Sequence, residues 1–373
     1  MILHSIRRNL GNIPGWCTNR KIVVFESDDW GSIRMPSKEA YLRLKERGVD
    51  LESSDYARYN KNETLASKKD LEFLYEVLFN VKDSKSRPCV FTALSLVANP
   101  NFKEIRNHNF RQYFYEPFTD TLKRYYPNED VFDIWKEGIK TKIFVPQFHG
   151  REHLNVIAWL KALRDGDNDT LSAFREGLWG FVSKKKNIEY QAAFQLTSRD
   201  DVNLHKKILE DGLKLFESIH GYRAKYFVPP NGPINNELNE TLISNGIEFR
   251  STAKIQHESI DYAKTRKVLN WLGKIDRSGI IYLTRNCFFE PSQPGKDWID
   301  NCLNDIRIAF NCKKPAIISS HRVNYIGVLN PSNRDESLRQ LKILLHEITK
   351  NWPDVEFLSS DQLGSIIKES VLQ

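Results

Sequence analysis

The length and composition of the chain fit a soluble protein with one large α/β domain or two small ones. Its 373 residues are 40% hydrophobic and 28% charged, which allows a sizeable core and a hydrated surface. The net charge of +7 is a mild excess, and no recognisable nucleic-acid-binding motif accompanies it, so we expect no nucleic-acid partner. No run reaches the roughly 18 apolar residues of a membrane-spanning helix, and no apolar segment follows Arg7 and Arg8 as in a secretory signal.

The cysteines favour a reducing compartment. There are five of them, an odd number, and no two have the C-x-x-C spacing of a metal or redox motif: Cys17, Cys89, Cys287, Cys302 and Cys312. Together with the absence of an apolar leader, this usage predicts a cytoplasmic protein. The oligomeric state is left open.

Short runs of β-branched and aromatic residues predict strands at Lys21–Ser27, Pro88–Leu96, Ile143–Phe148, Glu189–Leu196, Lys225–Pro229, Ile247–Thr252, Ile280–Thr284, Pro315–Ser320 and Val355–Ser359. Amphipathic segments predict helices at Lys69–Phe79, Glu152–Arg164, Val202–Ile219, Asn236–Asn245, Trp298–Phe310 and Glu336–Lys350. Nearly continuous apolar strands that alternate with helices indicate a parallel sheet covered on its faces. A closed barrel and an open doubly wound sheet both satisfy this pattern.

Two further features concern the organisation of the chain. The segment of residues 97–142 is rich in Tyr, Phe and Asn and is long for a connection, so we interpret it as an insertion at the rim of a site. No glycine-rich turn follows the first predicted strand, which argues against a dinucleotide-binding fold.

Two adjacent carboxylates, Asp28 and Asp29, end the first predicted strand. Carboxylates in this position are costly unless they are paired or bound to a metal. One of them could hold a metal ion while its neighbour handles a proton. The alternative is an ordinary turn, since Asp-Asp-x-Gly is common loop chemistry.

A histidine pair, His149 and His153, closes the third predicted strand. If a helix begins near His149, the spacing of four residues puts both imidazoles on one face, within reach of one ion. Two imidazoles and a carboxylate suit Zn²⁺ or a similar divalent ion and leave a coordination position open for water. Glu152 would then point away from the metal, and chance pairs at this spacing also occur.

A third histidine, His321, ends the predicted strand at Pro315–Ser320. A histidine at the end of a buried strand can donate a proton near pH 7, and it can equally be a structural residue at the edge of the core. All three features follow predicted strands, and in a parallel α/β fold functional groups gather at the carboxyl ends of strands.

The order of these motifs resembles that of the polysaccharide deacetylase family, the NodB-homology carbohydrate esterases. The matching segments are Ser27–Gly31, His149–His153, Phe227–Gly232 and Ser319–His321. The resemblance implies a distorted (β/α) barrel with about seven parallel strands, formed as a single NodB-like domain over residues 1–373. It also implies that the site lies at the carboxyl ends of the strands.

The resemblance implies a role for each matching residue. Asp28 would be the general base, His321 the general acid, and Asp29, His149 and His153 the ligands of one divalent metal ion. That ion would be Zn²⁺, with Co²⁺, Ni²⁺, Mn²⁺ or Fe²⁺ as alternatives.

The predicted contacts with the substrate are less directly matched. The backbone N–H near Asn231 would help to hold the oxyanion. Because Trp30 follows a ligand directly, we select it as the aromatic surface for a sugar ring.

The sequence departs from the family pattern at several points. Trp30 intervenes between Asp29 and Gly31, and Asn231 stands where the family has a tyrosine. Val228 stands where the family has the arginine that orients the base, and Arg250, Arg285 and Arg322 are candidates to replace it. We find no clear equivalent of the aspartate that tunes the catalytic histidine.

The expected function is removal of an N-acetyl group from an amino sugar of a glycan or glycan precursor by a metal-dependent hydrolase, during synthesis of a surface glycan. The alternatives are a deformylase or other C–N hydrolase acting on a lipid-linked sugar, and a catalytically silent glycan-binding protein. Each of them has a carbohydrate as its partner.

Overall fold

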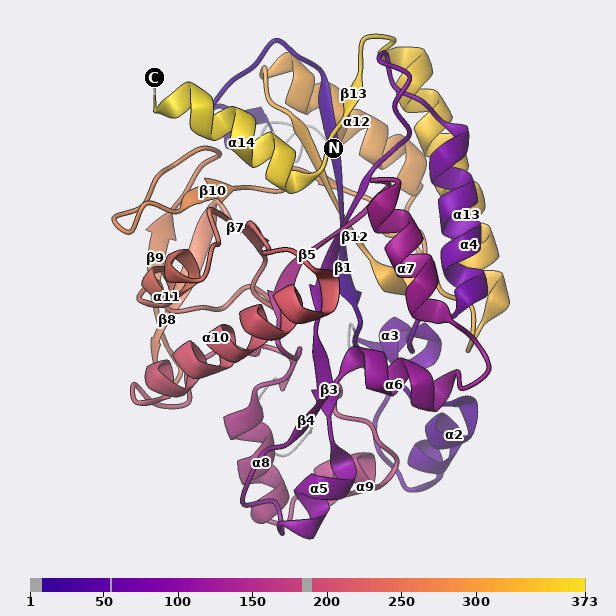
Figure 1. The fold of residues 1–373 in the computed structure, drawn as a ribbon, viewed down its shortest axis with the longest axis vertical. Coiled ribbons are helices and arrows are strands. Elements are labelled where there is room, and N and C mark those ends of the chain that lie inside the picture. The colour runs from indigo at the N-terminus through magenta and orange to yellow at the C-terminus, as the bar shows by residue number, and fades with distance from the viewer. Residues whose placement is uncertain (1–8, 54–55, 183–189, 373) are drawn as a thin grey trace.

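The computed structural model describes residues 9–53, 56–182 and 190–372 (Figure 1). Its centre is a nine-stranded sheet in which eight strands follow the order β10-β7-β6-β5-β2-β1-β12-β11 and β13 pairs with β1. Every pairing within this sheet is parallel. The strands are β1 (Ile22–Trp30), β2 (Phe91–Leu96), β5 (Phe144–Gly150), β6 (Tyr226–Phe227), β7 (Phe249–Ser251), β10 (Ile281–Leu283), β11 (Cys287–Phe288), β12 (Ala316–His321) and β13 (Glu356–Phe357).

Alternate residues of β1 pack on opposite sides of the sheet, as the pleat of a strand requires. Val23 and Phe25 belong to the outer core, which the helices cover. Ile22 and Val24 belong to an inner core that also takes residues from β2, β7, β10 and β12. Strands from both halves of the sheet therefore enclose one apolar interior, and the sheet is a curled, open barrel. The predicted distorted (β/α) barrel is confirmed. Its sheet has nine strands where about seven were expected, and several of the nine have only two or three residues.

Helices cover the outside of the barrel. In Figure 1, α4 (Lys68–Asn80), α7 (Val131–Lys140) and α13 (Pro331–Asn351) lie together on the right, and α10 (Asp201–His220) lies on the left. The remaining helices of this layer are α11 (Leu238–Ser244) and α12 (Trp298–Asn311). A further helix, α14 (Ser360–Val371), closes the inner core with Leu363 and Ile367. Within the described part of the chain, no helix combines the length and the apolar character needed to span a bilayer.

A second group of elements lies beyond the carboxyl end of β1, at the bottom of Figure 1. It contains α2 (Lys38–Glu46), α5 (Phe102–Asn107), α8 (Val156–Arg164) and α9 (Asn168–Arg175), which share a separate hydrophobic core. Residues 97–142, the predicted insertion, contribute to this group α5, the antiparallel pair of β3 (Ala98–Pro100) and β4 (Tyr115–Pro117), and α6 (Phe118–Tyr125). Their last helix, α7, belongs to the layer outside the barrel. The short helix α3 (Ala57–Asn62) completes this group.

The prediction of a strand at Glu189–Leu196 is wrong for the described residues 190–196, which are buried but irregular. Residue 189 lies outside the described residues. Asn155 provides hydrogen-bond donors for this backbone in the absence of a neighbouring strand. Its side chain donates to the carbonyls of Ala192 and Gln195, and its backbone N–H donates to the carbonyl of Tyr190. Side-chain donors thus replace a partner strand.

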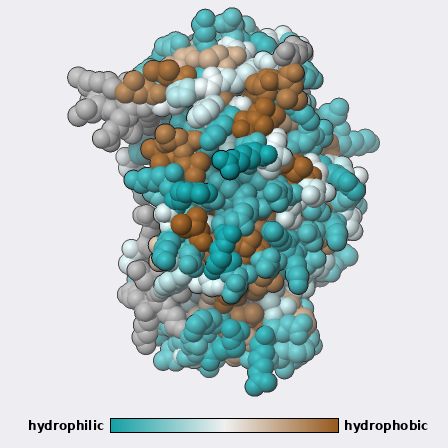
Figure 2. All heavy atoms as spheres, turned by 90° about the vertical axis from the view of Figure 1, so that its left-hand side faces the viewer, coloured by the Kyte–Doolittle hydropathy of each residue, from teal (hydrophilic) through white to brown (hydrophobic). Residues whose placement is uncertain are grey.

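The hairpin of β8 (Ile255–Asp261) and β9 (Lys264–Leu269) was not predicted. It stands on the left of Figure 1, the side that faces the viewer in Figure 2. On that face hydrophilic residues dominate, and hydrophobic ones form separate small patches (Figure 2). Because this hairpin exposes most of its residues to water, it lacks the apolar run by which buried strands are recognised.

Gly364 marks the closest packing of α14 against the sheet. A Cβ atom at this position would lie 2.6 Å from ring atoms of Phe249 in β7. We expect Gly364→Ala to lower the free energy of unfolding by about 1–2 kcal/mol, since overpacking costs more than the roughly 1 kcal/mol that alanine adds to a helix. Urea unfolding measures the change. The exposed Glu369→Ala in the same helix is the control, and a stabilised Gly364→Ala variant would contradict the packing.

Candidate metal and catalytic site

A β-bulge in β1 places both carboxylates in one pocket. Successive residues of a regular strand point to opposite faces. The register of β1 against β2 shifts between Ser27 and Trp30, and Asp29 has a φ of 75°. A non-glycine residue in this left-handed region is uncommon and costs free energy, and such strain often accompanies a functional site. As a result, Asp28 and Asp29 both line the same pocket.

The structure brings Asp29 together with the histidine pair. Asp29 Oδ1 lies 3.5 Å from His149 Nε2 and 3.2 Å from His153 Nε2. One ligand atom from each of the three residues lies within 4.8 Å of the others, and all three residues are buried. This compact set of one carboxylate and two imidazoles could hold a divalent transition-metal ion.

The helix expected around the histidine pair is absent. His149 belongs to β5, and His153 lies in the loop that follows, because α8 begins only at Val156. The predicted helix start at Glu152 is therefore wrong. Asn155 sets the later start, since its side chain accepts a hydrogen bond from the N–H of Ala158. The two imidazoles meet through the turn of the loop and not through one helical face.

The protonation of His149 suits metal binding. Its Nδ1 lies 2.7 Å from the carbonyl oxygen of Val228, which can only accept, so Nδ1 carries the proton. Nε2 is then the nitrogen that faces Asp29, as in metal-binding histidines whose other nitrogen is held by a carbonyl. Among the described residues, neither Asp29 Oδ1 nor His149 Nε2 has a hydrogen-bond partner. Buried polar atoms rarely stay unsatisfied, and a cation would satisfy both.

Ionisation of Asp29 is favoured even without a metal. Burial opposes the charge, but His153 and His149 outweigh it and hold the pKa of Asp29 well below its usual range. Glu152, which precedes His153 in the chain, is turned away from the cluster of Asp29, His149 and His153. It receives two hydrogen bonds from Arg151 and does not line the pocket.

Arg285, which follows β10, holds Asp28. Its Nη1 and Nη2 donate to the two carboxylate oxygens of Asp28 at 2.7 and 2.6 Å. Burial opposes the charge on Asp28, and this guanidinium outweighs it, so the pKa of Asp28 is below its ordinary value. Of the three candidate arginines, Arg250 donates to Asn239 and Asn236, and Arg322 pairs with Glu63. Arg285 is the one that contacts Asp28.

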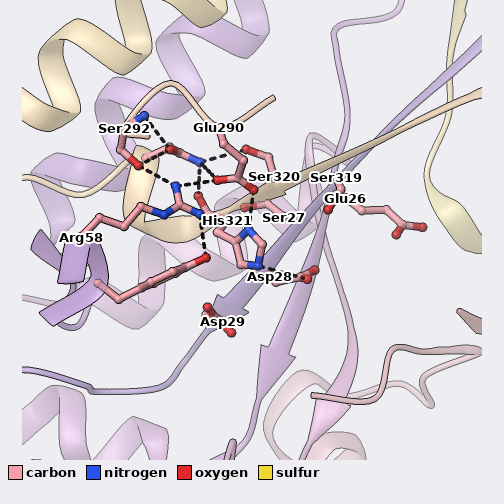
Figure 3. A network of polar contacts seen from close by, with 12 residues as sticks. Glu26, Ser27, Asp28, Asp29, Arg58, Glu290, Ser292, Ser319, Ser320 and His321 are labelled. Atoms are coloured by element: carbon pink, nitrogen blue, oxygen red, sulfur yellow. Dashed lines mark hydrogen bonds and ion pairs between the residues drawn. The ribbon is translucent and has the colours of Figure 1, made fainter. Parts of the chain in front are cut away.

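The pairing of β1 with β12 places Asp28 directly beside His321. Figure 3 shows His321 between Glu290 on one side and Asp28 on the other. His321 Nε2 lies 3.7 Å from Asp28 Oδ2, and its Nδ1 donates a hydrogen bond to Glu290 Oε1. Burial disfavours the imidazolium, but Glu290 more than compensates and raises the pKa of His321 to about 9. His321 is therefore protonated at neutral pH.

Glu290 is itself fixed by two donors. Arg58 donates to its Oε2 at 2.9 Å (Figure 3). Asn324 donates to the same oxygen, also at 2.9 Å. Glu290 is thus the carboxylate that contacts His321 and raises its pKa, and the sequence had offered no candidate for such a carboxylate. Glu290 comes directly after the aromatic pair at the end of β11, so its place at a strand end was the available signal.

The pocket over these residues has a volume of about 420 Å³. Asn231 lines it in the left-handed region at a φ of 53°, in the loop after β6 where the oxyanion donor was predicted. Tyr56 and Tyr59 also line the pocket, and neither was predicted.

Trp30 does not line the pocket, and the prediction that it contacts a sugar is wrong. It is 1% exposed, packs edge-on against Phe144 and donates its indole N–H to Ser27. Its side chain follows the bulge into the outer core, so proximity in sequence to Asp29 did not imply proximity to the pocket.

No protein-family model and no curated protein sequence matches this chain. Solved structures resemble it only weakly. A protein from Mycobacterium smegmatis described as a polysaccharide deacetylase is 12% identical, with a TM-score of 0.45, covering 96% of this chain and 94% of that one.

Two further solved structures are similar at the same level. A protein from Parabacteroides distasonis described as a glycoside hydrolase/deacetylase is 10% identical, with a TM-score of 0.47, covering 95% of this chain and 73% of that one. The 4-alpha-glucanotransferase of Thermococcus litoralis is 11% identical, with a TM-score of 0.44, covering 92% of this chain and 40% of that one. At such identities and scores the likeness says nothing about activity.

Proposed function

We propose that this protein is a divergent member of the polysaccharide deacetylase family, a divalent-metal hydrolase that removes the N-acetyl group from an amino sugar. The observation that carries the proposal is the juxtaposition of two sets of residues in one pocket. The first is the buried Asp29–His149–His153 cluster, and the second is the Asp28–His321 pair beside it.

The residues of the second set suit the two proton transfers of amide hydrolysis. Asp28, ionised and fixed by Arg285, is placed to accept a proton from the attacking water. His321, protonated through its contact with Glu290, is placed to donate a proton to the departing amine. Without that proton an amine is a very poor leaving group. The backbone around Asn231 is the proposed donor to the oxyanion.

The residues of the first set would hold the metal ion that acts as the electrophile. A divalent ion held by Asp29, His149 and His153 would polarise the amide carbonyl and lower the pKa of a water molecule. We propose Zn²⁺ as this ion because imidazole and carboxylate ligands suit it, with Co²⁺, Ni²⁺, Mn²⁺ and Fe²⁺ as alternatives that the same ligands accept.

The setting that we propose is cytoplasmic synthesis of a surface glycan. None of the five cysteines forms a disulfide in the part of the chain that the structure describes, which suits a reducing compartment. Degradation of an extracellular polymer would require export. The same arrangement of base, acid and cation could also remove a formyl group, so the identity of the acyl group is the main alternative.

The test is acyl release by the purified chain. The protein is stripped with a chelator and reloaded with each of the divalent ions separately, and then incubated with N-acetylated and N-formylated amino sugars while acetate, formate and free amine are measured. We expect acetate and amine in equal amounts, only with metal. Undiminished release by the stripped protein would contradict the mechanism, and sugar binding without turnover would identify a silent glycan-binding protein.

A further inference from the structure

Arg34 is a cation in the pocket that the proposed hydrolysis does not use. It follows β1 and lines the pocket together with Asp29 and His153, although only 3% of the residue is exposed. Arginine retains its charge at every physiological pH, so a positive charge stands permanently beside the candidate metal cluster.

Aromatic rings hold the Arg34 guanidinium in place. Its Cζ lies 4.6 Å from the ring centre of Tyr59 and 5.7 Å from that of Trp179. The same two rings contact the candidate catalytic residues. Tyr59 lies edge-on to His321 at 5.6 Å, and Trp179 stacks on His153 at 6.0 Å between ring centres. The cation therefore has a fixed position close to both the candidate acid and the candidate metal ligands.

The charge of Arg34 is only partly balanced. Arg34 and Arg322 share one carboxylate, Glu63, each at 3.2 Å, and the three side chains are at most 3% exposed. Two guanidinium groups and one carboxylate leave a buried excess of one positive charge. Nε of Arg34 faces Glu63 in this ion pair, and among the described residues Nη1 of Arg34 has no hydrogen-bond partner. Buried charged donors are normally paired, so this set lacks an anion.

We propose that Arg34 binds an anionic substituent, a carboxylate or a phosphate, on the amino sugar whose acyl group is removed. The planar guanidinium is the side chain best suited to such a group, because it can offer two parallel N–H donors. The inference rests on the proposed function and narrows its substrate to an acidic amino sugar.

Three probes test the inference: neutral N-acetylglucosamine, N-acetylmuramic acid with a carboxylate, and N-acetylglucosamine 6-phosphate. We expect the wild-type protein to have a higher kcat/KM for one of the acidic probes than for the neutral one. Arg34→Met should reduce kcat/KM for that acidic probe by about 10- to 100-fold, the effect of losing a hydrogen-bonded charge. It should change the value for the neutral probe by only a few fold. The better acidic probe identifies the anion as carboxylate or phosphate.

Arg322→Met is the matched control. It also takes one guanidinium from Glu63, but Arg322 does not line the pocket, so the preference for the acidic probe should survive. Arg34→Lys and Arg322→Lys form a second pair that keeps the charges if the methionine variants do not fold. An equal loss for the acidic and neutral probes in the Arg34 variant, or a wild-type preference for the neutral probe, would overturn the inference.

A binding measurement separates this inference from the proposed function. Calorimetric titration of the three probes reports on Arg34 whether or not any acyl group is released. Tighter binding of an acidic probe that disappears in Arg34→Met supports the anion site even in a protein without hydrolase activity. Equal binding of all three probes contradicts it.

Discussion

Asp29→Asn is expected to remove the bound metal and the hydrolase activity together, whereas Asp28→Asn is expected to remove the activity and leave the metal. The reason is geometric: Asp29 Oδ1 faces both imidazoles of the metal cluster, while both oxygens of Asp28 are held by Arg285. A neutral amide is a poor ligand for a transition-metal ion, and it cannot accept the proton of an attacking water.

The two variants should differ in metal content, although both lose catalytic rate. For Asp28→Asn we expect a loss of about 100- to 10,000-fold in kcat, the range of a general base, with one metal ion per chain retained. For Asp29→Asn we expect metal content to fall in parallel with the rate. Elemental analysis after dialysis, together with single-turnover rates, measures both quantities.

The two variants are matched controls for each other, since they make the same chemical change at adjacent buried positions. Full metal content in Asp29→Asn would contradict the proposed ligand set. Loss of metal and rate in Asp28→Asn, together with loss of rate but retention of metal in Asp29→Asn, would exchange the two roles.

The second large effect concerns the pH dependence of the rate. Glu290 raises the pKa of His321 to about 9, so the protonated acid is present through neutral pH and is lost as the pH rises through about 9. The rate should therefore fall on the alkaline side in this region. Glu290→Gln removes the carboxylate that stabilises the imidazolium, and the fall should begin at lower pH.

The expected loss follows from the population of the acid. If the pKa of His321 returns to its ordinary value of about 6.5, the protonated fraction at pH 8 drops by roughly 30-fold, and kcat at pH 8 should drop by the same order. Profiles of kcat between pH 5 and pH 10 measure the shift.

His321→Ala is the control for this experiment and should abolish the alkaline limb altogether. Ser292→Ala removes a neighbour of Arg58 and Asn324 without removing the charge of Glu290 and should leave the limb in place. An unchanged alkaline limb in Glu290→Gln would show that His321 is not the acid that limits the rate.

Much of the fold was predictable because buried parallel strands leave a local signal. The apolar runs that became β1, β2, β5 and β12 are continuous, since both faces of these strands are covered. The same signal misled at residues 190–196, which are equally buried. There two carbonyls accept hydrogen bonds from the side chain of Asn155, which is 37 and 40 residues away and which a local pattern does not reveal.

Those residues of the candidate site that end a predicted strand could be identified from the sequence. Asp28, Asp29, His149 and His321 each end an apolar run, and parallel strands bring their carboxyl ends to one edge. Arg285 and Glu290 were harder to find, because each lies more than 30 residues from its partner. Nothing local distinguished Arg285 from Arg250 and Arg322.

By itself, the amino-acid sequence determined the alternation of buried strands and helices and the residue types available for metal binding and proton transfer, because these depend on side chains close together in the chain. The tertiary structure alone decided which cation holds Asp28, which carboxylate raises the pKa of His321, and that Trp30 turns into the core. These choices depend on strand order, on register and on one bulge, which together fix distances between residues 31 positions apart (Glu290 and His321) and 257 positions apart (Asp28 and Arg285). The electrostatic interactions that tune a site fall off with distance in space and do not depend on separation along the chain.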